Sequence, residues 1–303
     1  MIEYVYGNIK LSNDEYENYI TLDGEEFLLS YLNPGKPYNK GASSNLFILI
    51  DPNGDTEDRV IKICKTPYHK YSKDRSILRF KREERAFRTV EREGADGVIG
   101  FYSSGVINLA GIDFLYLILE KADNDLASYM EENKFAFTSN QKLNFCIRLL
   151  ASFKRLHELG IYHRDIKHDN ILVVGGELKI GDLGLITFQD RDYGMDRDNE
   201  KIGPAGWLCP EATNKMLTYR KNIGNVYDCV IDHQSDIFQL GKLFWYIFQG
   251  NIPTGQVQSG DRRFAEQDIY EVVFSMIQYD KIRRPTIDQI NVQMAPIAAR
   301  LFV

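Results

Sequence analysis

One short polar stretch carries most of the chemistry that this sequence offers. It reads HRDIKHDNIL over residues 163–172 and lies between a long helical pattern and two short strand-like runs. Within it, Asp165 can accept a proton from a hydroxyl group, Lys167 can neutralise a phosphate, and Asn170 can bind a metal ion. Further on, GDLG at residues 181–184 adds a second carboxylate on a glycine-flanked turn. Phosphoryl transfer needs this combination of an oriented hydroxyl, a cation and hard oxygen ligands.

The order His-Arg-Asp-x-Lys-x-x-Asn resembles the catalytic loop of eukaryotic-type (Hanks-type) serine/threonine protein kinases, and the resemblance covers roughly residues 27–295. It implies that Asp165 is the catalytic base, that Lys167 is the cation at the γ-phosphate, and that Asn170 and Asp182 bind Mg²⁺ or Mn²⁺. ATP is then the implied cofactor and a protein hydroxyl the acceptor, with autophosphorylation expected too. Taken alone, the motif could instead be a surface loop whose charged side chains are solvated and have no catalytic role.

A candidate phosphate ligand lies upstream, in the apolar run VIKI at residues 60–63. By resemblance to the third strand of that family, Lys62 binds the α- and β-phosphates. A lysine in such a run more usually protects the edge of a sheet. Glu83 lies in a helical pattern further on and would form the ion pair that holds Lys62 in place. Glu84 is adjacent and equally acidic, so both glutamates remain candidates.

The glycine-rich loop of the family is incomplete in this sequence. The best register is NKGASSNLF at residues 39–47, in which Gly41 stands at a glycine position while Asn39 and Ser44 replace the other two glycines. Asn tolerates a positive φ and Ser is small, so such a loop can still approach phosphates. The resemblance therefore assigns nucleotide contacts to these three residues and to Leu46.

The adenine ring is expected at the segment LILEKADNDL, residues 117–126. By resemblance, Leu119 closes the back of the adenine pocket, and the backbone of Glu120 and Ala122 pairs with adenine. Asp125 would reach a ribose hydroxyl. An ordinary core strand that ends in a polar loop predicts the same burial, so the segment alone does not separate the two interpretations.

Three later segments resemble the framework that builds a peptide-binding surface. They are GPAGWLCPE at 203–211, SDIFQLG at 235–241 and DKIRRPT at 280–286. Asp236 is expected to bind the backbone of the catalytic loop, and Arg284 to pair with Glu211. Such a framework disfavours a kinase of small molecules, of the choline or aminoglycoside type. Between Glu211 and Asp236 the chain is longer than the family leads us to expect.

Lys167 favours serine and threonine over tyrosine as acceptors, by the same resemblance. Trp207 and Pro204 depart from that pattern, because tyrosine kinases often carry Trp at the first position and Ser/Thr kinases usually carry Thr at the second. A pseudokinase that acts as a binding module is a further alternative. The incomplete glycine loop favours it, whereas the presence of Lys62, Asp165 and Asp182 argues against it.

Arg164 precedes the catalytic Asp, and in such kinases this arginine commonly grips a phosphorylated residue of the activation loop. Between residues 188 and 212 there is no Ser or Thr, and Tyr193 is the only hydroxyl. The same window holds several acidic residues that could give Arg164 a permanent carboxylate: Asp190, Asp192, Asp196, Asp198 and Glu200. We therefore expect activity without loop phosphorylation, with control by abundance, a partner or another domain. A merely solvated acidic loop is the alternative.

The elements around these motifs change along the chain. Short strand-like runs occur at residues 27–32, 46–50, 59–64, 98–102 and 114–119, with a charged helical stretch at 74–93. Helical patterns follow, above all at 143–159 and 237–248. The prediction is an α+β, bilobal kinase fold with a β-rich N-lobe to about residue 121 and a helical C-lobe from about 122 to 303. Residues 1–25 form an N-terminal extension, and residues 26–303 form the kinase domain.

Composition limits the remaining function classes. The 303 residues carry a formal net charge of −6, which disfavours dedicated binding to nucleic acid or to an anionic membrane. No apolar run approaches the length that spans a bilayer, and the N-terminus lacks the pattern of a secretory signal. The four cysteines are scattered without a CxxC pair, which favours free thiols. We expect a cytoplasmic protein whose partners are protein substrates, with a regulatory partner left open.

Overall fold

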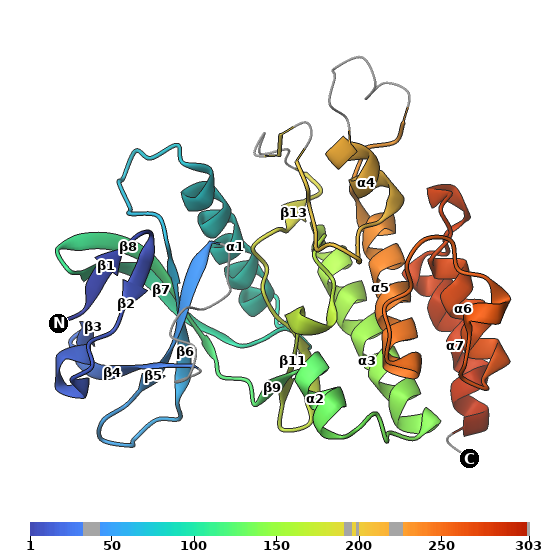
Figure 1. Cartoon of the computed structure of the whole chain (residues 1–303), viewed down its shortest axis with the longest axis horizontal. Helices are drawn as coiled ribbons and strands as arrows, with labels where there is room; N and C mark the ends of the chain where they lie inside the picture. The colour runs from blue at the N-terminus through green and yellow to red at the C-terminus, as the bar shows by residue number, and fades with distance from the viewer. Residues whose placement is uncertain (33–42, 191–195, 198–199, 218–226, 302–303) are drawn as a thin grey trace. The chain divides into compact units, whose positions relative to one another are not determined.

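The computed structural model describes residues 1–32, 43–190, 196–197, 200–217 and 227–301. The chain divides into two compact units, shown in Figure 1. The first comprises Met1–Glu91 and Ile99–Ala122, and the second comprises Arg92–Val98 and Asp123–Val303. Residues Asn39 and Gly41, assigned above to the nucleotide loop, lie outside the described residues, and so does Tyr193.

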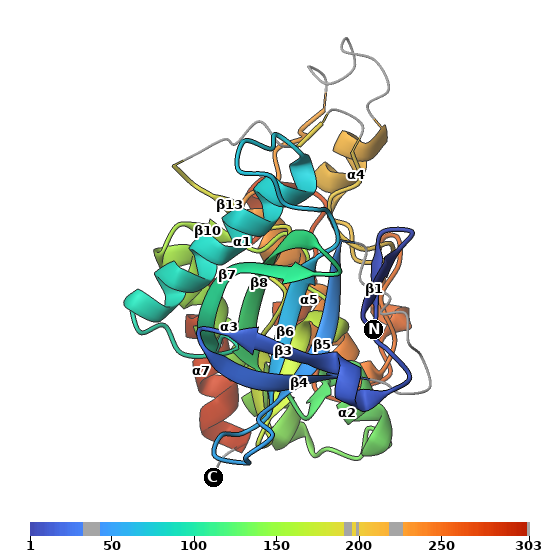
Figure 2. The same cartoon turned by 90° about the vertical axis from the view of Figure 1, so that its left-hand side faces the viewer.

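An antiparallel sheet of six strands forms the centre of the first unit (Figure 2). In spatial order its strands are β3 (Tyr19–Leu22), β4 (Glu25–Tyr31), β5 (Ser44–Ile50), β6 (Arg59–Cys64), β8 (Ile112–Glu120) and β7 (Phe101–Leu109). Helix α1 (Arg75–Arg92) follows β6. The strand predicted at 98–102 is shifted, because β7 begins at Phe101 and Val98 instead forms a parallel bridge with Ile180.

Side chains alternate between the two faces of this sheet, as the pleat of a strand requires. Lys62 pairs in register with Leu46 on β5 and with Leu117 on β8, so these three residues share one face. The neighbours Ile61 and Ile63 point to the other face, where they belong to a buried apolar cluster. The register thus separates the face that carries Lys62 from a mainly apolar one.

The N-terminal segment covers the apolar face. It forms the hairpin β1 (Glu3–Val5) and β2 (Asn8–Lys10), the short 3₁₀ helix η1 (Glu15–Asn18) and strand β3. Ile9 and Leu11 join the apolar cluster, and the ring of Tyr4 lies 5.1 Å from that of Phe114. The hydroxyl of Tyr4 also donates to the carbonyl of Lys65. The extension is therefore an integral layer of the first unit.

We expect Ile9→Ala to lower the free energy of unfolding by about 2–4 kcal/mol, because Ile9 is 2% exposed and its loss leaves a cavity over the sheet. Val5→Ala in the same hairpin is the matched control, since Val5 is exposed. Urea unfolding of both variants measures the difference. Equal stability of the two variants would contradict the packing described for the hairpin.

Helices dominate the second unit (Figure 1). They are α2 (Leu126–Glu132), α3 (Ser139–Glu158), α4 (Pro210–Leu217), α5 (His233–Gln249), α6 (Gln267–Met276) and α7 (Ile287–Leu301), with 3₁₀ turns η2 (His168–Asn170), η3 (Ser259–Asp261) and η4 (Lys281–Arg283). Strands β9 (Asn124–Asp125), β11 (Ile171–Val174) and β12 (Glu177–Ile180) form one small sheet. A second pairs β10 (Ile161–Tyr162) with β13 (Thr187–Phe188).

The two long helices predicted from the sequence are α3 and α5, and both have clear start signals. Thr138 and Gln141 form a capping box at the start of α3, and Asp232 and Ser235 form another at the start of α5. Helix α5 ends at Gly250, whose φ of 81° suits a left-handed cap. Almost every side chain of α5 is buried, so this is the central helix of the unit.

Within the described residues, no helix is both long and apolar enough to cross a membrane.

Candidate active site

Helix α5 holds the catalytic loop through its backbone. The carboxylate of Asp236 accepts hydrogen bonds from the amides of His163 (2.7 Å) and Arg164 (2.8 Å). One turn later, Gln239 accepts from the amide of Ile166 at 3.0 Å and donates to the carbonyl of Arg164 at 3.3 Å. The role of Asp236 confirms the sequence prediction. Gln239 was missed, although its position three residues after Asp236 on the same helical face was a usable signal.

Asp236 remains ionised although it is fully buried. Burial alone would raise the pKa of its carboxyl group, but the hydrogen bond and charge of His157, together with the amide of Arg164, outweigh burial and lower the pKa. His157 Nε2 lies 3.0 Å from the Asp236 carboxylate. The ionised carboxylate of Asp236 thus holds the backbone of the loop that carries Asp165.

His163 connects the catalytic loop to the GDLG turn. Its Nε2 donates to the carbonyl of Gly181 at 3.1 Å, and its Nδ1 accepts from the amide of Asp165 at 3.2 Å. These two contacts require the tautomer that is protonated at Nε2. The amide of Gly181 in turn donates to the carbonyl of Asn170 at 2.8 Å. Fixed backbone positions therefore relate Asn170 to Asp182, which follows Gly181.

The predicted catalytic base, cation and amide lie together in the loop. Asn170 Nδ2 donates to Asp165 Oδ2 at 2.8 Å, and Lys167 Nζ lies 3.9 Å from the same oxygen. Burial, with a smaller contribution from the charge of Asp182, raises the pKa of Asp165, whereas Lys167, His163 and Asn170 act in the opposite direction. A carboxylate that is buried but partnered by a cation is well suited to accept a hydroxyl proton.

Asp182 differs from its neighbours because it is exposed, and its φ of 46° is left-handed. The adjacent Gly181 allows this turn, since a Cβ there would lie 2.7 Å from the side chain of Leu172. The amide of Gly184 donates to Asp182 Oδ1 at 3.3 Å. Such strained backbone at a non-glycine residue is common at functional sites.

Arg164 also has a positive φ, of 66°, and its guanidinium group is buried. Its Nε donates to the carbonyl of Leu185 at 2.8 Å, and its Nη1 donates to Asp196 Oδ2 at 2.5 Å. Among the acidic residues of this window that the structure describes, Asp196 pairs with Arg164, whereas Asp192 and Asp198 lie outside the described residues. The sequence alone could not select it, because all five lie in a stretch without periodicity.

In the first unit, Lys62 Nζ lies 2.6 Å from Glu83 Oε1, and both side chains are buried. The adjacent Glu84 instead pairs with Arg88 and accepts from Ser104. Helical geometry explains the choice, because Glu83 lies on the buried face of α1 and Glu84 on its outer side. An ion pair this buried is costly to break at one end only.

The residues assigned to the nucleotide follow the register of the sheet. Ser44 and Leu46 lie on β5 on the same face as Lys62, and Leu119 pairs with Val60 on that face. Among the described residues the buried Ser44 hydroxyl finds no hydrogen-bond partner. A buried unsatisfied hydroxyl costs about 1–3 kcal/mol, which a ligand oxygen would offset.

The residues after β8 have structural partners as well. The amide of Glu120 donates to the carbonyl of Gly100, and its side chain accepts from the amide of Gly100. Ala122 ends the first unit. In the second unit, Asp125 is the N-cap of α2 and accepts from the amide of Ser128 at 2.8 Å. The cap leaves acceptor capacity on the Asp125 carboxylate, which has about four lone-pair sites.

Glu211 and Arg284 form the buried pair that the sequence predicts. Arg284 donates to both carboxylate oxygens of Glu211, at 2.6 and 3.0 Å, and Ser235 donates to the same carboxylate at 2.7 Å. This cluster ties the start of α4 to the start of α5 and to the segment after η4. The insertion predicted between Glu211 and Asp236 includes residues 218–226, which lie outside the described residues.

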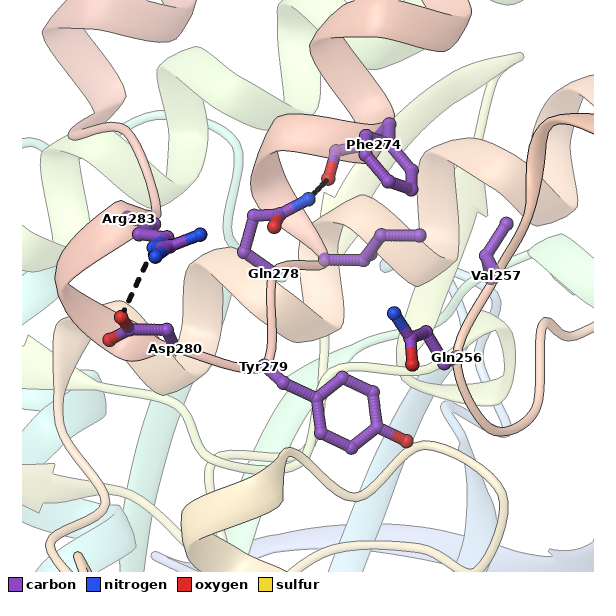
Figure 3. A pocket seen from close by; sticks show the side chains of 8 residues that line it. Gln256, Val257, Phe274, Gln278, Tyr279, Asp280 and Arg283 are labelled. Atoms are coloured by element: carbon purple, nitrogen blue, oxygen red, sulfur yellow. Dashed lines mark hydrogen bonds and ion pairs between the residues drawn. The ribbon is translucent and has the colours of Figure 1, made fainter.

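A cavity of about 220 Å³ occurs elsewhere in the second unit (Figure 3). Its lining includes Phe274, Gln278, Tyr279, Asp280 and Arg283. Polar groups of the lining bond to the protein itself, since Gln278 donates to the carbonyl of Phe274 and Arg283 pairs with Asp280. None of the residues assigned to catalysis lines this cavity, so we assign no ligand to it.

Comparison with known proteins identifies the family. A family model described as the protein kinase domain matches residues 41–295, which is most of the chain, so the chain belongs to that family. Protein kinases use ATP with a divalent metal ion, generally Mg²⁺, and act on protein substrates. The α+β fold and the catalytic-loop motif agree with this assignment.

Several curated kinases are similar to the chain. The mouse dual specificity protein kinase TTK is 23% identical over 218 residues, which is 72% of this chain and 24% of TTK. The serine/threonine-protein kinase mph1 of Schizosaccharomyces pombe is 24% identical over 220 residues, 71% of this chain and 30% of mph1. Rat cyclin-dependent kinase 11B is 37% identical over 189 residues, 58% of this chain and 41% of that kinase. The chain thus spans less than half the length of these relatives.

Proposed function

We propose that this protein transfers the γ-phosphoryl group of ATP to serine and threonine hydroxyls of protein substrates, including its own. The observation that carries the proposal is the geometry of the catalytic loop, in which Asp165 is fixed by Asn170 and lies 3.9 Å from the ammonium group of Lys167. The similarity to kinases named as serine/threonine-specific supports the choice of acceptor.

The proposed roles follow from the charge of each group. Asp165 accepts the proton of the substrate hydroxyl as its oxygen bonds to the γ-phosphorus of ATP, while the bond from that phosphorus to the β–γ bridging oxygen breaks and ADP leaves. Lys167 compensates the negative charge that develops on the transferred phosphoryl group. The burial that raises the pKa of Asp165 makes this carboxylate a better base than an exposed aspartate.

Mg²⁺–ATP, when bound, supplies the phosphoryl group and neutralises part of its charge. Asn170 and Asp182 offer the oxygen atoms that Mg²⁺ or Mn²⁺ prefers. In the part of the chain that the structure describes, no group of three or more His, Cys, Asp or Glu side chains could hold a metal ion alone. A site of two protein ligands that is completed by phosphate oxygens fits this donor set.

Lys62, held by Glu83, is the proposed ligand of the α- and β-phosphates. Ser44, Leu46, Leu119, and the backbone of Glu120 and Ala122 are the proposed contacts of the rest of the nucleotide, together with Asn39, Gly41 and Asp125. The unpartnered hydroxyl of Ser44 supports this assignment for β5. We further propose a cytoplasmic protein without nucleic-acid or membrane partners, in line with its net charge of −6.

The proposal is tested by thermal unfolding of the full chain with ATP, with and without Mg²⁺, followed by transfer to the proteins of a cell extract. We expect stabilisation by Mg²⁺–ATP and labelled substrates, both lost in EDTA. Stabilisation without any transfer would instead indicate a pseudokinase that serves as a binding module. If neither stabilisation nor transfer occurs, the result would contradict nucleotide binding altogether.

The Arg164–Asp196 pair predicts activity that does not depend on phosphorylation. We expect Asp196→Asn to lower the turnover number about tenfold, which corresponds to about 1.4 kcal/mol of barrier, because Arg164 loses its carboxylate. Asp190→Asn is the matched control, since Asp190 is exposed in the same segment. Treatment with a broad phosphatase, and the variant Tyr193→Phe, should leave turnover unchanged. A tenfold loss after phosphatase treatment would show that a phosphate switch exists.

A further inference from the structure

One face of α5 contacts two functional loops in succession. Asp236, Gln239, Lys242 and Tyr246 recur every three or four residues, which places them on the same side of the helix. The first two hold the catalytic loop, as described above. Lys242 and Tyr246 contact the segment 203–209, which we call the 203–209 loop.

Lys242 is an unusual member of this face because it is a buried cation. Its side chain donates to the carbonyl of Gly206, and its Nζ lies 5.7 Å from the centroid of the Phe238 ring. The residue is 6% exposed, and no carboxylate pairs with it among the residues that the structure describes. Burial lowers the pKa of Lys242 to about 8, against a smaller opposite effect of Cys209.

Stability alone gives no reason for a lysine at this position. Burial of an ammonium group without a counter-ion is unfavourable, whereas an apolar side chain of similar length would pack in the same space without that cost. The lowered pKa of Lys242 has this cause, because burial disfavours the charged form. Among the described residues, the hydrogen bond that its ammonium group makes is with the carbonyl of Gly206 in the 203–209 loop.

The loop that Lys242 holds has a specific backbone shape. Gly203 and Gly206 have φ values of 103° and 84°, so two of its residues adopt conformations that other side chains rarely tolerate. The amide of Trp207 donates to the carbonyl of Pro204 at 3.1 Å, which closes a turn around Gly206. The Trp207 ring lies 6.3 Å from that of Tyr246 on α5.

We propose that Lys242 is a positioning residue for the protein substrate, which fixes the turn of the 203–209 loop through the carbonyl of Gly206. The inference rests on the proposed function, because it requires a protein substrate that contacts this loop. Lys242 takes no part in proton transfer or nucleotide binding. Its effect is therefore expected in substrate affinity and not in the chemical step.

The test compares Lys242→Met with Lys142→Met in the full chain. Met keeps the length of the side chain and removes the charge. Lys142 is a matched control because burial also lowers its pKa and it also donates to a backbone carbonyl, that of Phe248, outside the 203–209 loop. For Lys242→Met we expect KM for a protein substrate to rise at least about tenfold, the effect of one hydrogen bond from a charged group. The turnover number and KM for ATP should stay near their original values.

Hydrogen exchange measures the anchoring itself and needs no activity. In Lys242→Met the amide of Trp207 should exchange at least about tenfold faster, because the turn that protects it loses its anchor. Lys142→Met should change neither KM nor this exchange rate. Unchanged exchange in Lys242→Met would overturn the anchor, and faster exchange with an unchanged KM would overturn the role in substrate binding. A chain that transfers no phosphate would refute the proposed function separately, while the exchange rates would still decide the anchor.

Discussion

Asp165→Asn is expected to reduce the turnover number by about 10²–10⁴-fold, the usual contribution of a positioned general base. Asn has the same shape and its carbonyl oxygen can still accept from Asn170 Nδ2, so the loop keeps its hydrogen bond. The neutral amide of this asparagine, however, cannot accept the proton of the substrate hydroxyl. Asp169→Asn in the same loop is the control, because Asp169 is exposed, and it should cause a much smaller loss. Circular dichroism and thermal unfolding verify that both variants fold.

The acidic side of the pH profile gives a second measure of the same group. Because burial raises the pKa of Asp165, its carboxylate becomes protonated at a higher pH than an ordinary aspartate. Since only the ionised form can act as a base, kcat/KM should fall as the pH decreases toward that raised pKa. A profile that stays flat through the ordinary titration range of aspartate would contradict the assignment of Asp165.

The second large effect concerns stability, at the buried pair of Glu211 and Arg284. We expect Arg284→Ala to lower the free energy of unfolding by about 3–5 kcal/mol, because it leaves the Glu211 carboxylate buried with Ser235 as its remaining side-chain partner. Arg283→Ala is the control, since Arg283 is 74% exposed in its pair with Asp280 and such pairs contribute about 0–1 kcal/mol. Equal losses in the two variants would contradict the buried cluster.

The pH dependence of this pair has a definite sign. Burial tends to raise the pKa of Glu211, but the hydrogen bond and charge of Arg284 outweigh it, so the folded-state pKa lies below the unfolded one. The pair therefore stabilises the fold fully above the unfolded pKa of Glu211. That contribution is lost as the pH falls through the lowered folded pKa. In Arg284→Ala this acid-dependent component should be absent.

The sequence predicted well those elements whose periodicity and end signals agree. Helices α3 and α5 and strands β11 and β12 combine apolar periodicity with caps or glycine turns, and the structure has them at the predicted places. The strand predicted at 98–102 starts too early, because the apolar residue Val98 resembles a strand residue but forms a parallel bridge with Ile180, whereas β7 begins at Phe101. A pairing between residues so far apart in the sequence cannot be predicted from local composition.

Which side chains pair with one another depends on three-dimensional features that the sequence pattern does not contain. The choice of Glu83 over Glu84 follows from which face of α1 is buried, and the choice of Asp196 from the path of an irregular segment. The N-terminal hairpin was expected only as an extension, because its role depends on the apolar face of a sheet formed far along the chain. The pattern at 237–248 is apolar almost all round and gives no signal that singles out Lys242.

The most direct test of the central claim is the identity of the residues that receive phosphate. The full chain is incubated with γ-labelled ATP, Mg²⁺ and a mixture of protein substrates, and the labelled amino acids are separated after hydrolysis, with Asp165→Asn in parallel. The account predicts label on serine and threonine with the original chain and almost none with Asp165→Asn. Label confined to tyrosine, or equal labelling by Asp165→Asn, would contradict it.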